Sequence, residues 1–208
     1  MNKKRAYKIL NLLKKQYPNA KIILNYSNNF ELLVSVMLSA QTTDIQVNKV
    51  TSSLFSKYKL DKSEINEIKN FAKANLQELE NDIKSIGLYK NKAKNIKLAS
   101  QILLDKFNGR IPKTITELTY LPGVGRKTAN VVLGNAYGIS EGIAVDTHVS
   151  RLSQKYGFSK EKNPDKIERD LMMLFDKKDW QKVTYLLIEH GGNIRKTKND
   201  FISDQNLL

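Results

Sequence analysis

The segment LPGVGRKTAN, Leu121 to Asn130, places an arginine and a lysine directly after two closely spaced glycines. Such glycines let another backbone approach closely, and a lysine amine is a nucleophile when it is deprotonated. A P-loop needs lysine directly after its second glycine, but here Arg126 intervenes and the glycines are too close together. A dinucleotide-binding loop needs glycine at position 128, which is Thr128. Both nucleotide-binding interpretations therefore fail on spacing.

A helix–hairpin–helix fits the same residues better. One helix would end at Leu121-Pro122, the glycines would reverse the chain, and a second helix would begin at Arg126. The first N–H groups of that helix and the positive end of its dipole suit a DNA phosphate, without reading the base sequence. The alternative is an ordinary compact turn. We predict the following DNA-binding residues: Gly123, Val124, Gly125, Arg126 and Thr128.

Composition narrows the class of partner. The 208 residues include 35 Lys and Arg against 21 Asp and Glu, which gives a formal net charge of +14. This charge favours a polyanionic partner, most commonly nucleic acid, although a basic inert surface is the alternative. There are no cysteines, which excludes disulfides, thiol nucleophiles and clusters bound by thiolates. The two histidines, His148 and His190, are too few for a histidine-rich site, so we predict no metal.

Neither a membrane span nor a signal peptide is indicated. The longest apolar run, Leu32 to Leu38, is far shorter than the ~18 residues that a span needs. The N-terminal MNKKRAYKILNLLKKQ lacks a long apolar h-region and a small-residue cleavage site. We therefore expect a cytoplasmic, nucleoid-associated monomer.

Apolar residues recur at helical spacing along nearly the whole chain, which predicts an all-α protein of about ten helices. Only Lys21–Tyr26 resembles a strand, and one strand makes no sheet. The clearest break lies at Gly138–Gly142. The predicted helices are Ala6–Tyr17, a run buried on all sides over Phe30–Leu38, Thr43 to Tyr58, Glu64–Ala74, Leu76–Ile86, Lys90–Phe107, Thr114 to Pro122-Gly123, Arg126–Tyr137, one capped by Asp146, one opened by Asn163-Pro164, and one through Val183–His190.

These segments together resemble the endonuclease III family of helix–hairpin–helix DNA glycosylases. LPGVGRKTANVVL is similar to the family's hairpin and following helix, and AVDTHV (Ala144–Val149) to its catalytic-aspartate segment. Three more signatures match: SAQTTD (Ser39–Asp44), IKSIGLYKNKAKNI (Ile83–Ile96) and LIEHG (Leu187–Gly191). The resemblance follows the family order from about residue 29 to 191.

The resemblance implies a bifunctional enzyme of base excision repair. It would cut the N-glycosidic bond of an oxidised pyrimidine in duplex DNA and then cleave the strand by β-elimination. Lys127 matches the nucleophile that forms a Schiff base at C1′. We expect the helix N-terminus, Arg126 and the exclusion of water by DNA to favour its neutral amine. Asp146 matches the carboxylate that stabilises positive charge on the sugar, and we also expect it to cap the following helix.

Two further residues follow from the resemblance. Gln41 and Leu88 would fill the gap left in the duplex when the damaged nucleotide leaves the stack. From the residues alone, Gln41 would be an ordinary loop residue and Leu88 a core residue. We expect His148 and His190 to have structural roles.

The sequence departs from the family at its C-terminal end. Most members bind a [4Fe-4S] cluster through four cysteines after the LIEHG segment, and this chain has none. Members without the cluster are known, so the predicted chemistry stands. Arg195, Lys196 and Lys198 are expected to meet phosphates from a mobile tail. The resemblance also allows a monovalent cation held by hairpin carbonyls.

The family fold would give two all-α lobes with a DNA-binding cleft between them. One would be a six-helix barrel over residues 23–137 that carries Lys127, and the other would combine residues 1–22 and 138–208 and carry Asp146. Two alternatives remain: a monofunctional glycosylase for another lesion, and a non-catalytic helix–hairpin–helix DNA-binding paralogue. The sequence leaves the lesion range undefined.

Overall fold

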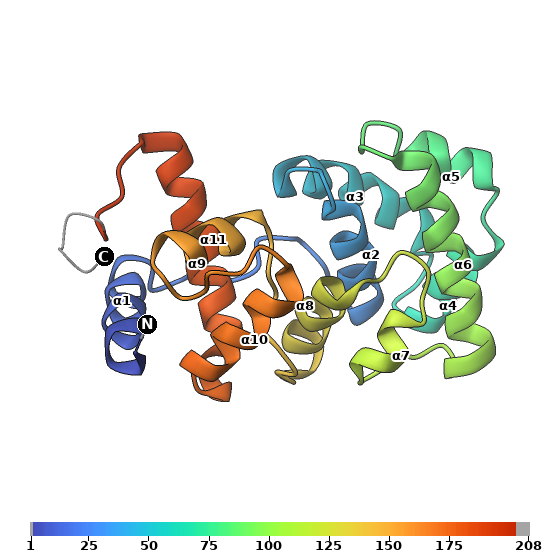
Figure 1. Cartoon of the computed structure of the whole chain (residues 1–208). Coiled ribbons are helices and arrows are strands. Elements are labelled where there is room, and N and C mark those ends of the chain that lie inside the picture. The colour runs from blue at the N-terminus through green and yellow to red at the C-terminus, as the bar shows by residue number, and fades with distance from the viewer. Residues whose placement is uncertain (1, 203–208) are drawn as a thin grey trace. The chain divides into compact units, whose positions relative to one another are not determined.

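The computed structural model describes residues 2–202, which contain eleven α-helices and one 3-10 helix but no strand (Figure 1). The predicted all-α class is therefore confirmed. The chain divides into two compact units. Unit 1 contains the described parts of Met1–Ile22 and Ser140–Leu208, and unit 2 is Ile23–Ile139.

The helices follow one another along the chain as α1 (Lys3–Gln16), α2 (Asn29–Ser39), α3 (Asp44–Tyr58), α4 (Glu64–Lys73), α5 (Leu76–Asp82), α6 (Tyr89–Phe107), α7 (Ile115–Thr119), α8 (Arg126–Tyr137), α9 (Thr147–Lys155), α10 (Pro164–Leu174), the 3-10 helix η1 (Lys177–Asp179) and α11 (Trp180–Thr197). Two predicted ends are wrong. The helix expected to reach Ile86 ends at Asp82, because Ile83 and Ile86 are buried by a turn instead. The helix expected to reach Pro122 ends at Thr119, and η1 was not predicted.

Most helices begin at a side chain that accepts a hydrogen bond from the first turn. In α7, Thr114 accepts the N–H of Glu117 and donates its hydroxyl to the Glu117 carboxylate. Each such cap satisfies N–H groups that the helix itself leaves unpaired. The capping residues are Asn2, Asn28, Thr43, Ser63, Asn75, Thr114, Asp146 and Asn163.

Unit 2 is built around α2, which is buried on all sides from Phe30 to Leu38, as the sequence predicts. This helix packs against α3, α4, α6 and α8. The Phe71 ring of α4 contacts two other aromatic rings, with centroids 5.2 Å from Phe30 and 4.5 Å from Tyr58. The apolar side of α8 completes the interior with Ala129, Val132 and Leu133, all fully buried.

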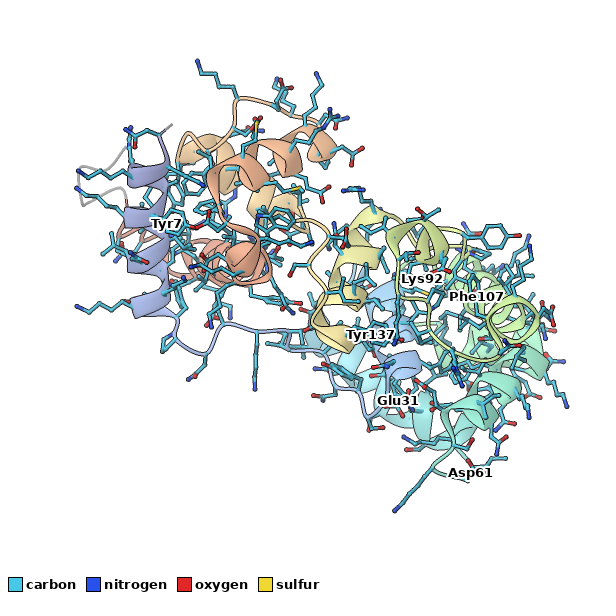
Figure 2. All side chains as sticks on the ribbon, turned by 90° about the horizontal axis from the view of Figure 1, so that it is seen from below. Tyr7, Glu31, Asp61, Lys92, Phe107 and Tyr137 are labelled. Atoms are coloured by element: carbon cyan, nitrogen blue, oxygen red, sulfur yellow. The ribbon has the colours of Figure 1, made fainter. Side chains whose placement is uncertain are left out.

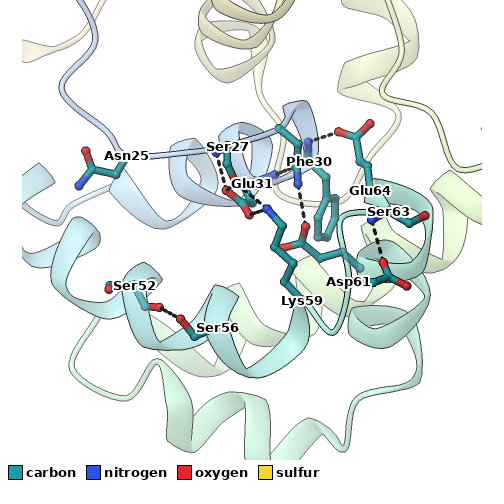
Figure 3. Close-up of polar contacts among 12 residues, drawn as sticks. Asn25, Ser27, Phe30, Glu31, Ser52, Ser56, Lys59, Asp61, Ser63 and Glu64 are labelled. Atoms are coloured by element: carbon teal, nitrogen blue, oxygen red, sulfur yellow. Dashed lines mark hydrogen bonds and ion pairs between the residues drawn. The ribbon is translucent and has the colours of Figure 1, made fainter.

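The N-terminus of α2 is surrounded by carboxylates of the chain itself (Figure 3). The backbone N–H of Phe30 donates to Glu64 Oε1 at 2.7 Å. Glu31 accepts hydrogen bonds from the N–H and hydroxyl of Ser27 and pairs with Lys59 Nζ at 2.8 Å. Burial raises the pKa of Glu31, but its bonds to Lys59 and Ser27 outweigh burial and hold the pKa below its ordinary value.

Glu67 of α4 completes this group and is 1% exposed. Its Oε2 accepts a 2.8 Å bond from the side chain of Asn28, the capping residue of α2. Its Oε1 has no hydrogen-bond partner among residues 2–202. Burial raises the pKa of Glu67 to about 7, against the hydrogen bond from Asn28. This carboxyl is therefore partly protonated at neutral pH.

Unit 1 packs α1, α9, α10 and α11 around a second apolar core with a polar centre. His190 of α11 is fully buried, and its Nδ1 lies 3.0 Å from the hydroxyl of Tyr17. Its Nε2 lies 2.7 Å from the hydroxyl of Tyr156 and 3.0 Å from Asp200 Oδ1. Lys155 pairs with the other oxygen of Asp200 at 2.6 Å. Burial lowers the pKa of His190 although Asp200 opposes the shift.

This network attaches the segment after α11 to the core, with Ile202 fully buried. The helix itself continues to Thr197, so Arg195 and Lys196 lie in its last turn rather than in a tail. The expectation of a tail is therefore wrong for these two basic residues. None of the helices in residues 2–202 could span a membrane.

Candidate DNA-binding and catalytic site

The hairpin between α7 and α8 needs glycine at position 123 for two reasons. Gly123 has φ +79°, a conformation that side-chain-bearing residues rarely adopt. A Cβ at this position would also lie 2.8 Å from the side-chain nitrogen of Asn95 in α6. Val124 closes the turn by donating its N–H to the Leu121 carbonyl, and both of these side chains are buried. Val124 thus shapes the hairpin, while Gly123 is exposed.

Gly125 differs from Gly123 because nothing in the fold requires it to be glycine. Its φ is −89°, and a Cβ built on it would meet no atom within 4 Å among residues 2–202. It is the N-cap of α8, and no side chain in the described part of the chain caps this helix. The space beyond the start of the helix is therefore open, and the glycine keeps it so.

The first turn of α8 is basic and exposed. It contains Arg126 and Lys127 and no acidic residue. The first intrahelical bond runs from the N–H of Ala129 to the Gly125 carbonyl, so the N–H groups of Lys127 and Thr128 precede the helical ladder. The positive end of the helix dipole adds to these charges. An anion such as a DNA phosphate fits this combination.

Lys127 is an exposed amine on a helix fixed to the interior. The opposite side of α8 packs against α2, and the helix ends at Gly138, whose left-handed backbone directs N–H groups to the last carbonyls. Asn130 and Gly134 lie beside Lys127 on its helix face, are buried and carry no charge. The lysine is therefore accessible to a substrate while its backbone is held in place.

Asp146 belongs to unit 1, where it caps α9. Its Oδ1 accepts the N–H of Val149 at 2.8 Å, as the sequence predicts, and the side chain is half-buried. This bond fixes the direction of the carboxylate. The ring of His148 is packed against the backbone of Gly191, since a Cβ there would lie 2.6 Å from His148 Nδ1. Both histidines thus have the structural surroundings that we expected.

Gln41 and Leu88 lie on two exposed loops of unit 2 that meet each other. Both residues have left-handed backbone conformations, with φ of 57° and 59°, which are unusual for residues other than glycine. The Leu88 side chain is 58% exposed, which excludes the core-packing interpretation. A Cβ at Gly87 would lie 3.5 Å from the Gln41 carbonyl oxygen. The structure therefore brings these two predicted residues together.

Lys92 of α6 was missed by sequence reasoning. Lys92, which Figure 2 labels, is only 7% exposed. It donates to the carbonyls of Leu38 and Ala40, directly before Gln41 in the chain. Burial lowers the pKa of Lys92. Its spacing of four and seven residues from the buried Ile96 and Ala99 is the sequence signal that could have found it, because this spacing places the lysine on the inner side of the helix.

The residues present do not fit the iron–sulfur cluster that the resemblance would imply, because the sequence has no cysteine to ligate it. Residues 2–202 also contain no group of three carboxylate or histidine side chains that could hold a metal ion. The place after His190 is instead occupied by the end of α11 and the segment that Asp200 attaches.

Residues 34–177 match the HhH-GPD superfamily of base excision DNA repair proteins, which is the class that the hairpin and the all-α fold define. Endonuclease III of Synechocystis sp. (strain ATCC 27184 / PCC 6803 / Kazusa) is 47% identical over 189 residues, which cover 91% of this chain and 83% of the relative. Endonuclease III of Bacillus subtilis (strain 168) is 44% identical over 192 residues, 92% of this chain and 84% of the relative.

A solved structure of a trapped endonuclease III–DNA covalent intermediate has a TM-score of 0.88 and 42% identity to this chain. The match covers 96% of this chain and 90% of that one. The chain belongs to the endonuclease III family, and the resemblance of its motifs to that family is confirmed.

Proposed function

We propose that this protein is a bifunctional DNA glycosylase and abasic-site lyase that removes oxidised pyrimidines from duplex DNA. The observation that carries the proposal is the start of α8, where an uncapped, basic helix N-terminus and an exposed lysine occupy the same turn. Membership of a base excision repair family and the likeness to a trapped DNA intermediate support it. Lys127 argues against the monofunctional alternative, because base hydrolysis alone needs no amine.

The hairpin would hold the strand and Lys127 would break it. The N–H groups of α8 and the space over Gly125 would receive a phosphate, so that Lys127 faces the adjacent sugar. The neutral amine attacks C1′ as the N-glycosidic bond breaks, and the bonding electrons leave with the base. Loss of the amine proton and opening of the sugar ring give a Schiff base.

The Schiff base then permits strand cleavage. It acidifies the C2′ hydrogen, whose removal expels the 3′ phosphate by β-elimination, and water finally hydrolyses the imine to release Lys127. Asp146, oriented by its bond to Val149, would stabilise the positive charge that develops on the sugar. Gln41 would satisfy the base left without a partner, and Leu88 would hold the stack open.

The same proposal covers the partner, location and cofactors. Damaged or abasic duplex DNA is the partner of a monomeric protein in the nucleoid region of the cytoplasm, with no membrane partner. No iron–sulfur chemistry takes part, since thiolate ligands are missing from the sequence. A monovalent cation held by the hairpin carbonyls would add to the attraction for phosphate.

Borohydride trapping tests the proposal. The protein is incubated with duplex DNA that carries thymine glycol or an abasic site, and the reduced covalent adduct is measured. Lys127→Ala should abolish the adduct, with at least a ~10³-fold loss of strand cleavage. Lys49→Ala, which removes an exposed lysine of α3, should trap like the unaltered protein.

Each alternative function has its own outcome in this experiment. Base release without an adduct would show a monofunctional glycosylase. Retarded DNA without base release would show a binding protein only. An adduct that persists in Lys127→Ala would show that another amine is the nucleophile.

A further inference from the structure

Lys92 lies one turn after Leu88 in α6, and its N–H donates to the Leu88 carbonyl. Its side chain crosses to a different part of the chain. The ammonium lies 2.9 Å from the Leu38 carbonyl and 3.4 Å from the Thr42 hydroxyl, and it also donates to the Ala40 carbonyl. These three acceptors flank Gln41 on both sides.

These acceptors match the three hydrogens of an ammonium group. An amine held in this way has no lone pair directed at a substrate, so Lys92 is not a second nucleophile. Leu38 instead lies in the last turn of α2, which ends at Ser39, and Ala40 is the C-cap of the helix. The carbonyls at this end carry the negative end of the helix dipole. The Lys92 ammonium therefore compensates the negative end of the α2 dipole and fixes the position at which the chain leaves this helix.

The loop that leaves α2 also approaches the Leu88 loop directly, because a Cβ at Gly87 would lie 3.5 Å from the Gln41 carbonyl oxygen. The first turn of α3, which follows the Gln41 loop, adds a second contact, in which Gln46 Nε2 donates to Ser85 Oγ at 2.9 Å. The left-handed backbone of Gln41 is strained and persists only where its surroundings enforce it. Lys92 enforces this conformation through its hydrogen bonds to the residues on both sides of Gln41.

We propose that Lys92 is a positioning residue that sets the exposed Gln41 side chain beside Leu88, so that the two residues enter the duplex as one preformed unit. The inference rests on the proposed function for the roles of Gln41 and Leu88. α6 begins directly after Leu88, the proposed apolar wedge, and it also carries Lys92, the cation that places the Gln41 amide. Neither residue then has to find its position after the damaged nucleotide has left the stack.

Lys97 is the matched control. It lies on the same helix and donates to the carbonyl of Ala74, the C-cap of α4. Lys97→Met therefore removes a lysine that ends a helix, as Lys92→Met does, but α4 carries neither Gln41 nor Leu88. A loss caused only by a weakened α6 or an unsatisfied carbonyl would appear in both variants.

The first measurement is independent of catalysis. The probe is duplex DNA with 2-aminopurine opposite a tetrahydrofuran abasic analogue, whose fluorescence reports how the orphaned base is stacked. The unaltered protein should change the fluorescence at saturating concentration. Lys92→Met and Gln41→Ala should lose that change, and the double variant should be no worse than Gln41→Ala alone. Lys97→Met should keep it.

The second measurement compares two reactions. Excision of thymine glycol from a duplex should fall about 10²-fold in Lys92→Met, the loss expected from a misplaced group. Cleavage of an abasic site in a single strand should be unchanged, because there is no opposite base to satisfy. A further variant, Thr42→Val, removes one acceptor without unpairing the buried charge and should give a smaller loss in the same direction.

The inference is overturned if Lys92→Met keeps the fluorescence change or if Lys97→Met loses it equally. If Lys92→Met does not fold, a Thr42→Val protein that behaves as the unaltered one overturns it instead. Failure of the proposed function would be seen separately, as trapping that does not depend on Lys127. The fluorescence arm would still decide the role of Lys92 in that case.

Discussion

α2 and α8 pack against each other in unit 2, but their N-termini have opposite surroundings. The start of α2 is capped by Asn28 and receives the carboxylates of Glu31 and Glu64. The start of α8 has a glycine at its N-cap, two basic residues and no acidic residue in its first turn. Both helices have the same positive dipole end, so the difference lies in where the compensating anion comes from.

This difference separates a structural helix start from a binding one. At α2 the chain supplies its own anions, and the site is closed and buried. At α8 the first turn carries two basic residues, and the position of Gly125 faces open space, an arrangement that suits a negative charge on another molecule. Eight of the eleven α-helices in residues 2–202 begin at a side-chain cap, whereas α6, α8 and α11 do not.

The difference between the two helices is tested by giving α8 the kind of N-terminus that α2 has. Gly125→Asp adds a capping carboxylate in the space now open, so stability should rise by a few tenths of a kcal/mol or stay unchanged. Affinity for duplex DNA should fall about 10²-fold, because like charges at an interface cost several kcal/mol. Thermal unfolding and fluorescence anisotropy measure the two effects. Equal DNA affinity would show that no phosphate binds there.

The closed start of α2 predicts a pH dependence centred on Glu67. Its folded pKa of about 7 lies above the ordinary value of 4.5, so the folded state binds the proton more tightly. The resulting stability is fully present below pH 4.5 and is lost as pH rises through 7. Between pH 5 and pH 8 the loss is on the order of 2 kcal/mol.

Glu67→Gln should remove this loss, and denaturant unfolding at the two pH values measures it. Glu78→Gln, at a side chain that is 65% exposed, is the control and should keep the pH dependence of the unaltered protein. An unchanged pH dependence in Glu67→Gln would show that this carboxyl ionises normally in the folded state.

Substituting the two hairpin glycines, Gly123 and Gly125, is expected to give the smallest changes in stability and DNA binding. Gly123→Ala should destabilise the protein by about 1–2 kcal/mol, because alanine at φ +79° is strained and its Cβ meets Asn95. Gly125→Ala should cost only a few tenths of a kcal/mol but weaken DNA binding by about tenfold, because its methyl group occupies the open space at the start of α8. Equal loss of stability in both variants would contradict the assignment of Gly125 to the ligand.

Helix starts were predictable from the sequence because their causes are local. Thr43, Thr114, Asp146 and Asn163 each cap a helix within the next three residues, so the pattern and the structure coincide. The end of α5 was not predictable in this way. Ile83 continues the helical spacing of apolar residues, but a turn buries it equally well, and spacing alone does not distinguish the two.

The residues of the candidate site differ in the same way, because some are predictable from their neighbours in the sequence and others depend on distant contacts. Lys127 and the hairpin follow from adjacent residues, and their recognition needed no long-range contact. The burial of Lys92 depends on carbonyls more than 50 positions earlier in the sequence. Glu67 likewise depends on Asn28, which is 39 positions away. Charged residues on helices are usually exposed, so sequence alone favoured the surface for both.

Leu88 is the N-cap of α6, and Lys92 and Asn95 lie within the helix, three residues apart on one side. They meet, in turn, the solvent, the loop of Gln41 and the backbone of Gly123. The direction in which α6 presents its residues thus sets the relative positions of three loops that are distant in sequence, those of Gln41, Leu88 and Gly123. Since each residue turns a helix by ~100°, lengthening α6 by one residue between Leu88 and Asn95 would point the leucine away from its partners.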